Sequence, residues 1–381
     1  MPLILTPVGA ILTLLGITLE WTTPAQTFNS GSDGSYGPMN ITSNTTLVLP
    51  TNGIFNCTTI TIAGGATLTF ARNVLNTPVY LLATGDVLIT GNVDVSGRPS
   101  AQALAGEGGP GGFDGGFPAA ATAEQPGDGY GPGGGTGGDP NSFFPNPALA
   151  GSFATVGILS APVLYGNPLL LPLIGGSGGG GQKGNPGNGG GGGGGAILIA
   201  SSTVIEHRGL ISANGGRAPN NVGEGSGGGI RLVAPRVFGS GRFEAIAPTG
   251  VGGNGIIRID AIDRSGWSFS FVGKTRQGQN MVVFPPPYRL SIIEAAGQAI
   301  AEGASGTVTV QLPHGASTNQ LVKVQARNFT NDVAIRVVVT PEMGPSSRYD
   351  TNIVMSANPS TVTVPVVLPA GQLSRINAWT R

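Results

Sequence analysis

Two arginines and one aspartate occupy related positions and could form a cluster for binding or catalysis. Arg231 and Arg258 fall at matching places in two short apolar segments, and Asp260 follows closely. Enzymes that cleave polysaccharides need paired carboxylates, or a carboxylate grouped with Lys or Arg. The other polar positions of these segments are mostly Thr, Ser and single charges. We therefore interpret the three residues as surface charges, predict no catalytic residue and expect that the protein is not an enzyme.

The two histidines and the single cysteine also fail to form a reactive group. His207 lies between Glu206 and Arg208, where we expect an exposed ion cluster at a turn, and His314 lies in a Pro-His-Gly loop. Cys57 cannot form an intrachain disulfide because it is the only cysteine. Its apolar surroundings predict a small buried side chain rather than a reactive thiol.

Three aspartates in glycine-rich stretches are candidate calcium ligands. Asp114, Asp128 and Asp139 have glycine neighbours, as do the aspartates of calcium-binding β-rolls. However, they do not recur at nine-residue spacing, and the oxygen-ligand pattern of an EF-hand is absent. We predict no metal site and no cofactor and keep calcium as an open alternative. Four sequons are possible glycosylation sites, at Asn40, Asn44, Asn56 and Asn328.

The composition excludes several classes of protein. The chain has 381 residues with 67 Gly and 30 Pro, and only 10% of its side chains are charged, 19 basic and 19 acidic. A nucleic-acid-binding protein would carry a basic surplus, and a disordered chain would have fewer apolar residues than the 39% found here. A neutral, β-rich protein interrupted by glycine remains.

Similar apolar segments recur at 196–200, 229–234 and 255–261, and we align them on their last alanines. Each is followed by a second strand-like segment, at 209–213, 241–245 and 266–271, and residues 79–83 with 91–95 fit the same frame. Repeats with periods of 20 to 50 residues are typical of solenoids. We therefore predict an all-β protein whose larger part is a parallel β-helix.

Glycine clusters fill residues 97–195, which we treat as an insertion in this β-helix. A flexible linker would need more Ser, Lys or Glu to stay solvated. Because glycine lacks Cβ, its backbone can pack closely against a neighbouring backbone. We predict packed glycine loops.

The chain is predicted to have four parts. Residues 1–26 form an apolar N-terminal strand segment, 27–284 the β-helix, 285–287 a proline linker and 288–381 an immunoglobulin-like β-sandwich of about seven short strands. Pro and Gly in the first segment favour an extended strand over a helix, and its apolar run is too short for a membrane helix.

An apolar N-terminal segment must be covered, either by its own chain or by another copy. We hypothesise that it pairs with a strand edge of an adjacent copy. The residues predicted to make this assembly contact are Leu3, Ile4, Leu5, Val8, Ile11, Leu12, Leu14, Leu15, Ile17 and Leu19.

Parts of the sequence resemble a family of uncharacterised, secreted, glycine-rich proteins of environmental bacteria. The resemblance lies in residues 77–91, 166–181 and 194–202 with 211–216. Members of that family also end in an Ig-like domain. The resemblance implies a surface or extracellular protein and supplies no activity and no catalytic residue.

These observations favour an extracellular structural protein that assembles with itself into a surface filament, sheath or matrix. One alternative is an adhesin or carbohydrate-binding fibre tip whose glycine loops present Tyr130, Phe143 and Phe144 to surface glycans. A third possible function is that of a carbohydrate-active enzyme. We expect no nucleic-acid partner and no membrane span.

Overall fold

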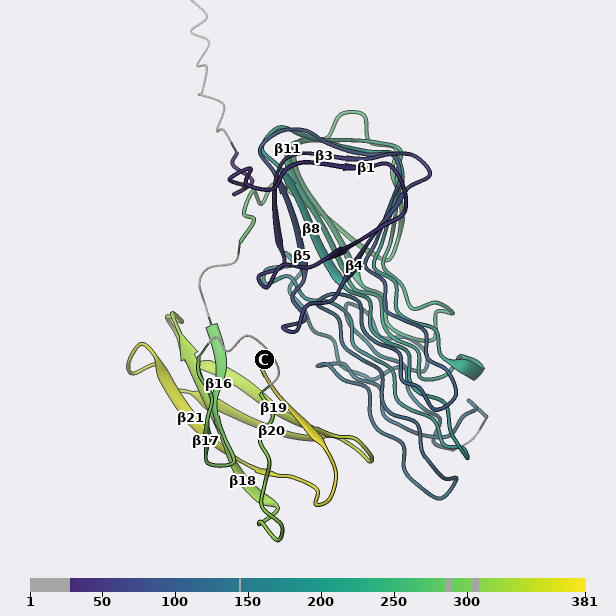
Figure 1. The fold of residues 1–381 in the computed structure, drawn as a ribbon, viewed down its shortest axis with the longest axis vertical. Coiled ribbons are helices and arrows are strands. Elements are labelled where there is room, and N and C mark those ends of the chain that lie inside the picture. The colour runs from purple at the N-terminus through teal and green to yellow at the C-terminus, as the bar shows by residue number, and fades with distance from the viewer. Residues whose placement is uncertain (1–27, 144, 285–288, 303–307) are drawn as a thin grey trace, which may run out of the picture.

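The computed structural model describes residues 28–143, 145–284, 289–302 and 308–381. In these ranges every regular element is a β-strand, apart from the short 3-10 helix Pro219–Asn221. Figure 1 shows three neighbouring bodies: a barrel of parallel strands, a layer of extended loops that continues from it, and a pair of antiparallel sheets. The predicted N-terminal assembly residues and the proline linker lie outside the described residues.

The barrel strands belong to one parallel sheet. They are β1 (Gly37–Ile41), β3 (Ile54–Ile62), β5 (Val79–Ala83), β6 (Val87–Ile89), β8 (Ala196–Ser201), β9 (Val204–His207), β11 (Gly229–Gly239), β13 (Ile256–Asp263) and β15 (Lys274–Gly278). Six of them pair in the order β11-β8-β5-β3-β6-β9, and β9 pairs with β11 again. The pairings therefore close into a six-stranded parallel barrel.

The closed barrel shows that our prediction of a parallel β-helix is wrong. The closure arises because β3 and β11 are long enough to pair with two strands each. β3 pairs with β5 and then β6, and β11 pairs with β8 and then β9. The repeats in the sequence indicated parallel neighbours, but nothing in their spacing indicated that two strands would each bridge two others.

A second parallel sheet packs on the same core. Its strands are β2 (Thr45–Val48), β4 (Thr67–Ala71), β7 (Asn92–Asp94), β10 (Leu210–Ser212), β12 (Arg242–Glu244) and β14 (Ser270–Val272), in the order β14-β12-β10-β7-β4-β2. Alternate side chains point inward, as the period of a strand requires. Ile60, Ile199, Val93 and Phe243 are among the fully buried residues that the two sheets share.

The repeat frame was correct for the second segments that begin at Gly91, Gly209 and Gly241 but not for the one that begins at Gly266, because Arg242 pairs with Ser270 and not with Trp267. Two of the first segments were shifted by one residue. Leu210 pairs with both Arg242 and Asn92, and Ala234 pairs with Ala261, as aligned. By contrast, Ala200 pairs with Val233, and Ala83 pairs with Ser201.

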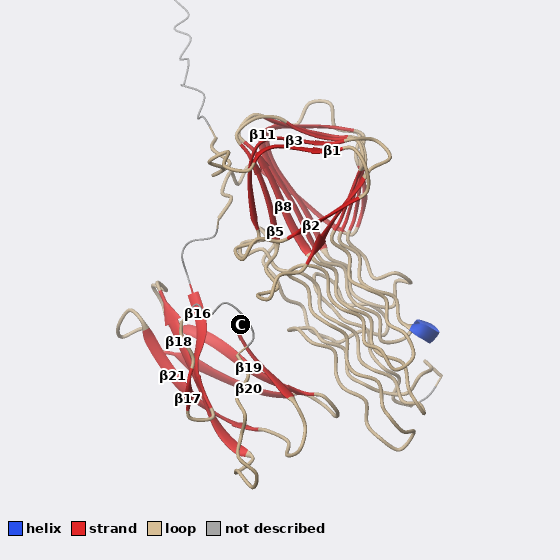
Figure 2. Cartoon of the chain, in the orientation of Figure 1, coloured by secondary structure: helices blue, strands red, loops and turns tan. Residues whose placement is uncertain are grey.

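The glycine layer consists of the described extended segments within residues 95–195, together with 213–228 and 245–255, which backbone hydrogen bonds connect. Figure 2 shows the layer as a stack of extended loops beside the barrel. Backbone hydrogen bonds join these segments: Gly109 donates to Gly193 at 2.9 Å, Gly190 to Gly116 at 2.9 Å and Gly176 to Gly194 at 2.8 Å. A Cβ added at Gly192 would lie 2.0 Å from the carbonyl oxygen of Glu107. The segments are so close that side chains cannot fit between them, so the layer is a packed body and not a linker.

The C-terminal strands form two antiparallel sheets over one apolar core. The first contains β16 (Arg289–Ala295), β17 (Gln298–Ala299), β18 (Asn319–Arg327) and β21 (Ser360–Val367), and the second contains β19 (Val333–Pro341), β20 (Ser347–Ile353) and β22 (Ser374–Thr380). Their orders are β17-β16-β18-β21 and β20-β19-β22.

These orders differ from the ABED and CFG sheets of an immunoglobulin constant domain. The short hairpin β16–β17 occupies one edge of the first sheet, and β20 pairs with β19 in the second. The prediction of an Ig-like sandwich is therefore corrected to two separate antiparallel sheets. Counting strands in the sequence could not reveal this difference in strand order.

Candidate functional site

The cluster of Arg231, Arg258 and Asp260 is buried, so our interpretation of these residues as surface charges is wrong. Arg231 and Asp260 are fully buried, and Arg258 is 6% exposed. The Asp260 carboxylate accepts hydrogen bonds from Arg231 Nη2 at 2.9 Å and from Arg258 Nε and Nη2, each at 2.7 Å. Two guanidinium groups therefore hold this single carboxylate.

The same cluster attaches two loops to the outer side of the barrel sheet. Arg231 donates to the carbonyl of Asn280 at 2.8 Å, and the amide of Asn280 donates to Asp260 at 3.0 Å. Arg258 reaches the carbonyl of Pro168 at 3.3 Å. Because an unpaired buried charge is costly, removing one member of this network should destabilise the others. Its role is structural.

His207 is also buried, contrary to the exposed ion cluster that we predicted. Its ring packs 4.6 Å from that of Phe243, and its Nε2 lies 3.1 Å from the carbonyl oxygen of Arg242. Burial lowers the pKa of His207 to about 4. The neighbouring Glu206 and Arg208 do form an ion pair at the surface. The imidazole is therefore neutral near pH 7 and packs among aromatic rings.

The other two candidate reactive residues differ in burial. Cys57 is fully buried, as predicted, and burial raises the pKa of its thiol to about 12. His314 is exposed. A buried thiol with a raised pKa is a weak nucleophile.

The three candidate calcium ligands bind groups of the chain itself. Asp114 pairs with Arg72 and Arg375, Asp128 accepts hydrogen bonds from Ser346, and Asp139 lies 3.4 Å from Lys183. The described part of the chain contains no group of three or more His, Cys, Asp or Glu residues that could hold a metal ion. Calcium binding gains no support from this geometry.

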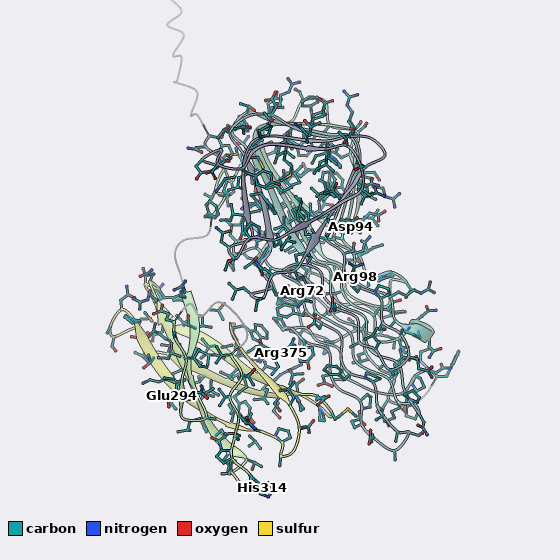
Figure 3. All side chains as sticks on the ribbon, viewed as in Figure 1. Arg72, Asp94, Arg98, Glu294, His314 and Arg375 are labelled. Atoms are coloured by element: carbon teal, nitrogen blue, oxygen red, sulfur yellow. The ribbon has the colours of Figure 1, made fainter. Side chains whose placement is uncertain are left out.

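The glycine layer contacts the C-terminal sheets through named side chains. The Arg375 guanidinium lies 4.3 Å from the centre of the Tyr130 ring, and the Phe113 ring meets Trp379 edge-on at 5.5 Å. Figure 3 shows Arg375 between the two bodies. Tyr130, which we had expected a glycine loop to present to ligands, is only 5% exposed because of this contact. Phe143 is 93% exposed, and Phe144 lies outside the described residues.

The strongest candidate for interaction with another molecule is the pair of open edges on the second parallel sheet. Within the described residues β2 pairs only with β4, and β14 pairs only with β12. Neither edge strand carries a charge: their sequences are Thr-Thr-Leu-Val and Ser-Phe-Val. Val48 is 76% exposed at one edge. Uncharged open edges are templates for pairing with another chain.

An incompletely covered aromatic group lies beside β14. Phe271 stacks on buried Phe243 at 5.4 Å, and Phe269 meets the same ring edge-on. Trp267, Phe269 and Phe271 are only partly buried. We had assigned assembly to the N-terminal segment and did not predict these edges. Their lack of charge was visible in the sequence, but their edge position depends on the sheet order.

The asparagines of the four sequons differ in solvent exposure. Asn40 and Asn44 are exposed, whereas Asn56 and Asn328 are half-buried. The side chain of Asn44 accepts a hydrogen bond from the amide of Thr67 at 3.0 Å. Glycosylation at any of the four remains a prediction.

Comparison of the chain with protein-family models, curated proteins and solved structures finds no match. The resemblance described above is therefore untested. None of the described helical segments has the length and apolar character needed to cross a membrane.

Proposed function

We propose that this chain is a non-enzymatic extracellular structural protein that associates head to tail with copies of itself. The observation that carries the proposal is the pair of uncharged, open edges, β2 and β14, at opposite ends of one parallel sheet. When β2 of one copy lies beside β14 of another, the sheet continues in the same direction. Such a contact joins different surfaces and can repeat without closing.

The register of the sheet specifies which residues would meet. Thr46 pairs with Thr69, which pairs with Asp94, and the same row continues through Ser212 and Glu244 to Val272. If the next copy keeps this register, its Thr46 lies opposite Val272. The contact would also cover the partly exposed aromatic group beside β14.

The glycine layer supports a structural role. It devotes a large part of the chain to closely packed backbone with almost no space for side chains. Such a body gives stiffness, but it offers few functional groups for chemistry. An extracellular location rests on the resemblance to secreted proteins and on the exposed sequons, and it is part of the proposal.

Charge substitutions at the two edges test the proposal. In Thr46→Glu with Val272→Glu, like charges would face each other across the contact, which destabilises strand pairs. We expect this variant to sediment as a monomer. The matched control, Thr46→Lys with Val272→Glu, places opposite charges there and should associate. If both variants associate as the unmodified protein does, the edges are not the contact.

A second candidate function is a surface-binding tip, and the exposure of Phe143 favours it. A fully exposed aromatic ring in a loop of the glycine layer could stack on the apolar face of a sugar. Binding to a panel of surface polysaccharides that Phe143→Ser abolishes would support this candidate. Unchanged binding in that variant would exclude this residue from the contact.

A further inference from the structure

A small cationic pocket lies beside β15, at the margin of the barrel sheet. It has a volume of about 160 Å³. Lys274 and Arg276 contribute its charges, and they point to the same face because they are two residues apart on one strand. The rest of the wall is largely apolar and comprises Ala154, Leu164, Tyr165, Gly166, Pro168 and Ile256.

Neither cation of this pocket is neutralised within the described residues. The Lys274 ammonium donates to the carbonyl of Ala154 at 2.9 Å, and Arg276 donates to the carbonyl of Thr275 at 3.1 Å. No ion pair of the described chain includes either residue. By contrast, Arg258, which pairs with Arg276 across the neighbouring strand, has a carboxylate partner. Two hydrogen bonds connect it to Asp260.

The apolar wall is held in place by the loop that contains Tyr165. The Tyr165 hydroxyl donates to the carbonyl of Gly175 at 2.8 Å and accepts from Ser177, so the ring is fixed and its polar atom is occupied. Its ring packs 4.6 Å from Phe153. Gly166 has a φ of +81°, and a Cβ there would lie 2.4 Å from the Phe153 ring. Hydrogen bonds and ring packing therefore hold this side of the pocket in place.

We propose that this pocket binds the carboxylate of a sugar acid, such as a uronate unit of an acidic polysaccharide. The ammonium and the guanidinium supply charged donors for the carboxylate oxygens. The apolar wall suits the carbon–hydrogen face of the sugar ring. The small volume admits one sugar unit, and the open side leaves room for the chain to continue. The inference goes beyond self-association and does not depend on it.

Titration calorimetry at low salt tests this proposal with sodium glucuronate as the probe. Glucose and sodium acetate are the comparison compounds, since each has only half of the recognised chemistry. We expect glucuronate to bind at least tenfold more tightly than either compound. The affinity should fall at least tenfold in Lys274→Gln with Arg276→Gln. The control Lys323→Gln with Arg348→Gln removes the same charge from the C-terminal sheets and should bind glucuronate normally.

A third variant tests the site without removing its cations. Leu164 is 60% exposed, so Leu164→Glu should fold and place a carboxylate beside Lys274 and Arg276. We expect this variant to lose glucuronate binding. Equal affinity for acetate and glucuronate, or equal glucuronate binding in all variants, would overturn the proposal. Because self-association is measured separately, by sedimentation, the two proposals can fail independently.

Discussion

Arg375 on the last strand lies over the ring of Tyr130 in the glycine layer, 4.3 Å from its centre, and also 3.2 Å from Asp114. Asp114 is shared, since it also pairs with Arg72. Burial opposes ionisation of Asp114, but hydrogen bonds and charges from the two arginines and the Gly108 amide hold its pKa below the usual value. The contact connects the C-terminal sheets to the glycine layer and uses a residue that the sequence suggested as a calcium ligand.

Replacing Arg375 should loosen this connection. In Arg375→Gln the cation–π contact and one ion pair are lost, while both bodies keep their own cores. We expect faster amide hydrogen exchange in β22 and a larger radius of gyration by X-ray scattering. Arg348→Gln, which removes an arginine from the same pair of sheets, is the control and should change neither measurement. An unchanged scattering profile in Arg375→Gln would show that other contacts hold the two bodies.

A side chain in the glycine layer should be destabilising. The Cβ of Gly192→Ala would lie within 2.0 to 2.7 Å of three backbone atoms at Glu107 and Gly108. Overpacking of this kind costs about 1–3 kcal/mol, and backbone cannot move as a flexible side chain can. Chemical denaturation should detect the loss. Gly64→Ala is the control because its nearest contacts are 4.0 Å away. If both variants unfold at the same denaturant concentration, the layer is not packed as described.

A charge in the barrel core should be strongly destabilising. Ile199 is fully buried in the shared core, so Ile199→Asp would bury a carboxylate without a partner, at a cost of several kcal/mol. Ile262 is 53% exposed on β13 and provides the matched control, Ile262→Asp, which should be nearly neutral. Thermal unfolding of the two variants checks this. Similar melting temperatures would mean that the inward face of β8 is wrongly assigned.

The parallel pairing of β7, β10 and β12 could be predicted from the sequence because a glycine precedes each of these strands. Gly209 and Gly241 stand in equivalent places, and the strands after them pair as aligned. The closure of the barrel could not be predicted. It depends on two strands of ordinary composition, β3 and β11, that each continue past one neighbour to a second.

Burial of charged groups was the main error in the candidate site. Arg231 and Asp260 look like surface residues of a strand that alternates between apolar and polar positions. They are buried because the loops at Pro168 and Asn280 cover that face of the sheet. These loops are distant in sequence and have no regular structure, so no local pattern predicts where they lie. The burial of His207 was also not predictable from local sequence. Its ring packs against Phe243 of β12 and Phe269 just before β14.

The free energy of unfolding should decrease as the pH is lowered, because of His207. The folded pKa of about 4 lies below the ordinary value of 6.5, so the unfolded chain binds the proton first as pH falls. The stabilising effect of the neutral ring is complete above pH 6.5 and is lost progressively between pH 6.5 and 4, by about 3 kcal/mol in total. Denaturation across this range measures it. His207→Gln should remove that part of the slope, whereas His314→Gln, at the only other histidine, should retain it.

The N-terminal segment provides a further prediction about assembly. Residues 1–21 contain many large aliphatic side chains and one charge, Glu20. Burial of each Leu or Ile stabilises by roughly 1.5–3 kcal/mol, so docking of a few could hold two copies together. Because the β2 and β14 edges remain, we expect a chain without residues 1–21 to be folded and to associate more weakly than the unshortened chain. If the shortened chain associates to the same extent, the segment is not required for the contact.

Sedimentation velocity of the unmodified chain over a range of concentrations tests the central claim of self-association most directly. Head-to-tail contacts that do not close predict a continuous series of species whose average size grows with concentration. The Thr46→Glu, Val272→Glu variant should remain at the monomer position throughout. A single monomeric boundary for the unmodified protein at every concentration would contradict the proposed function.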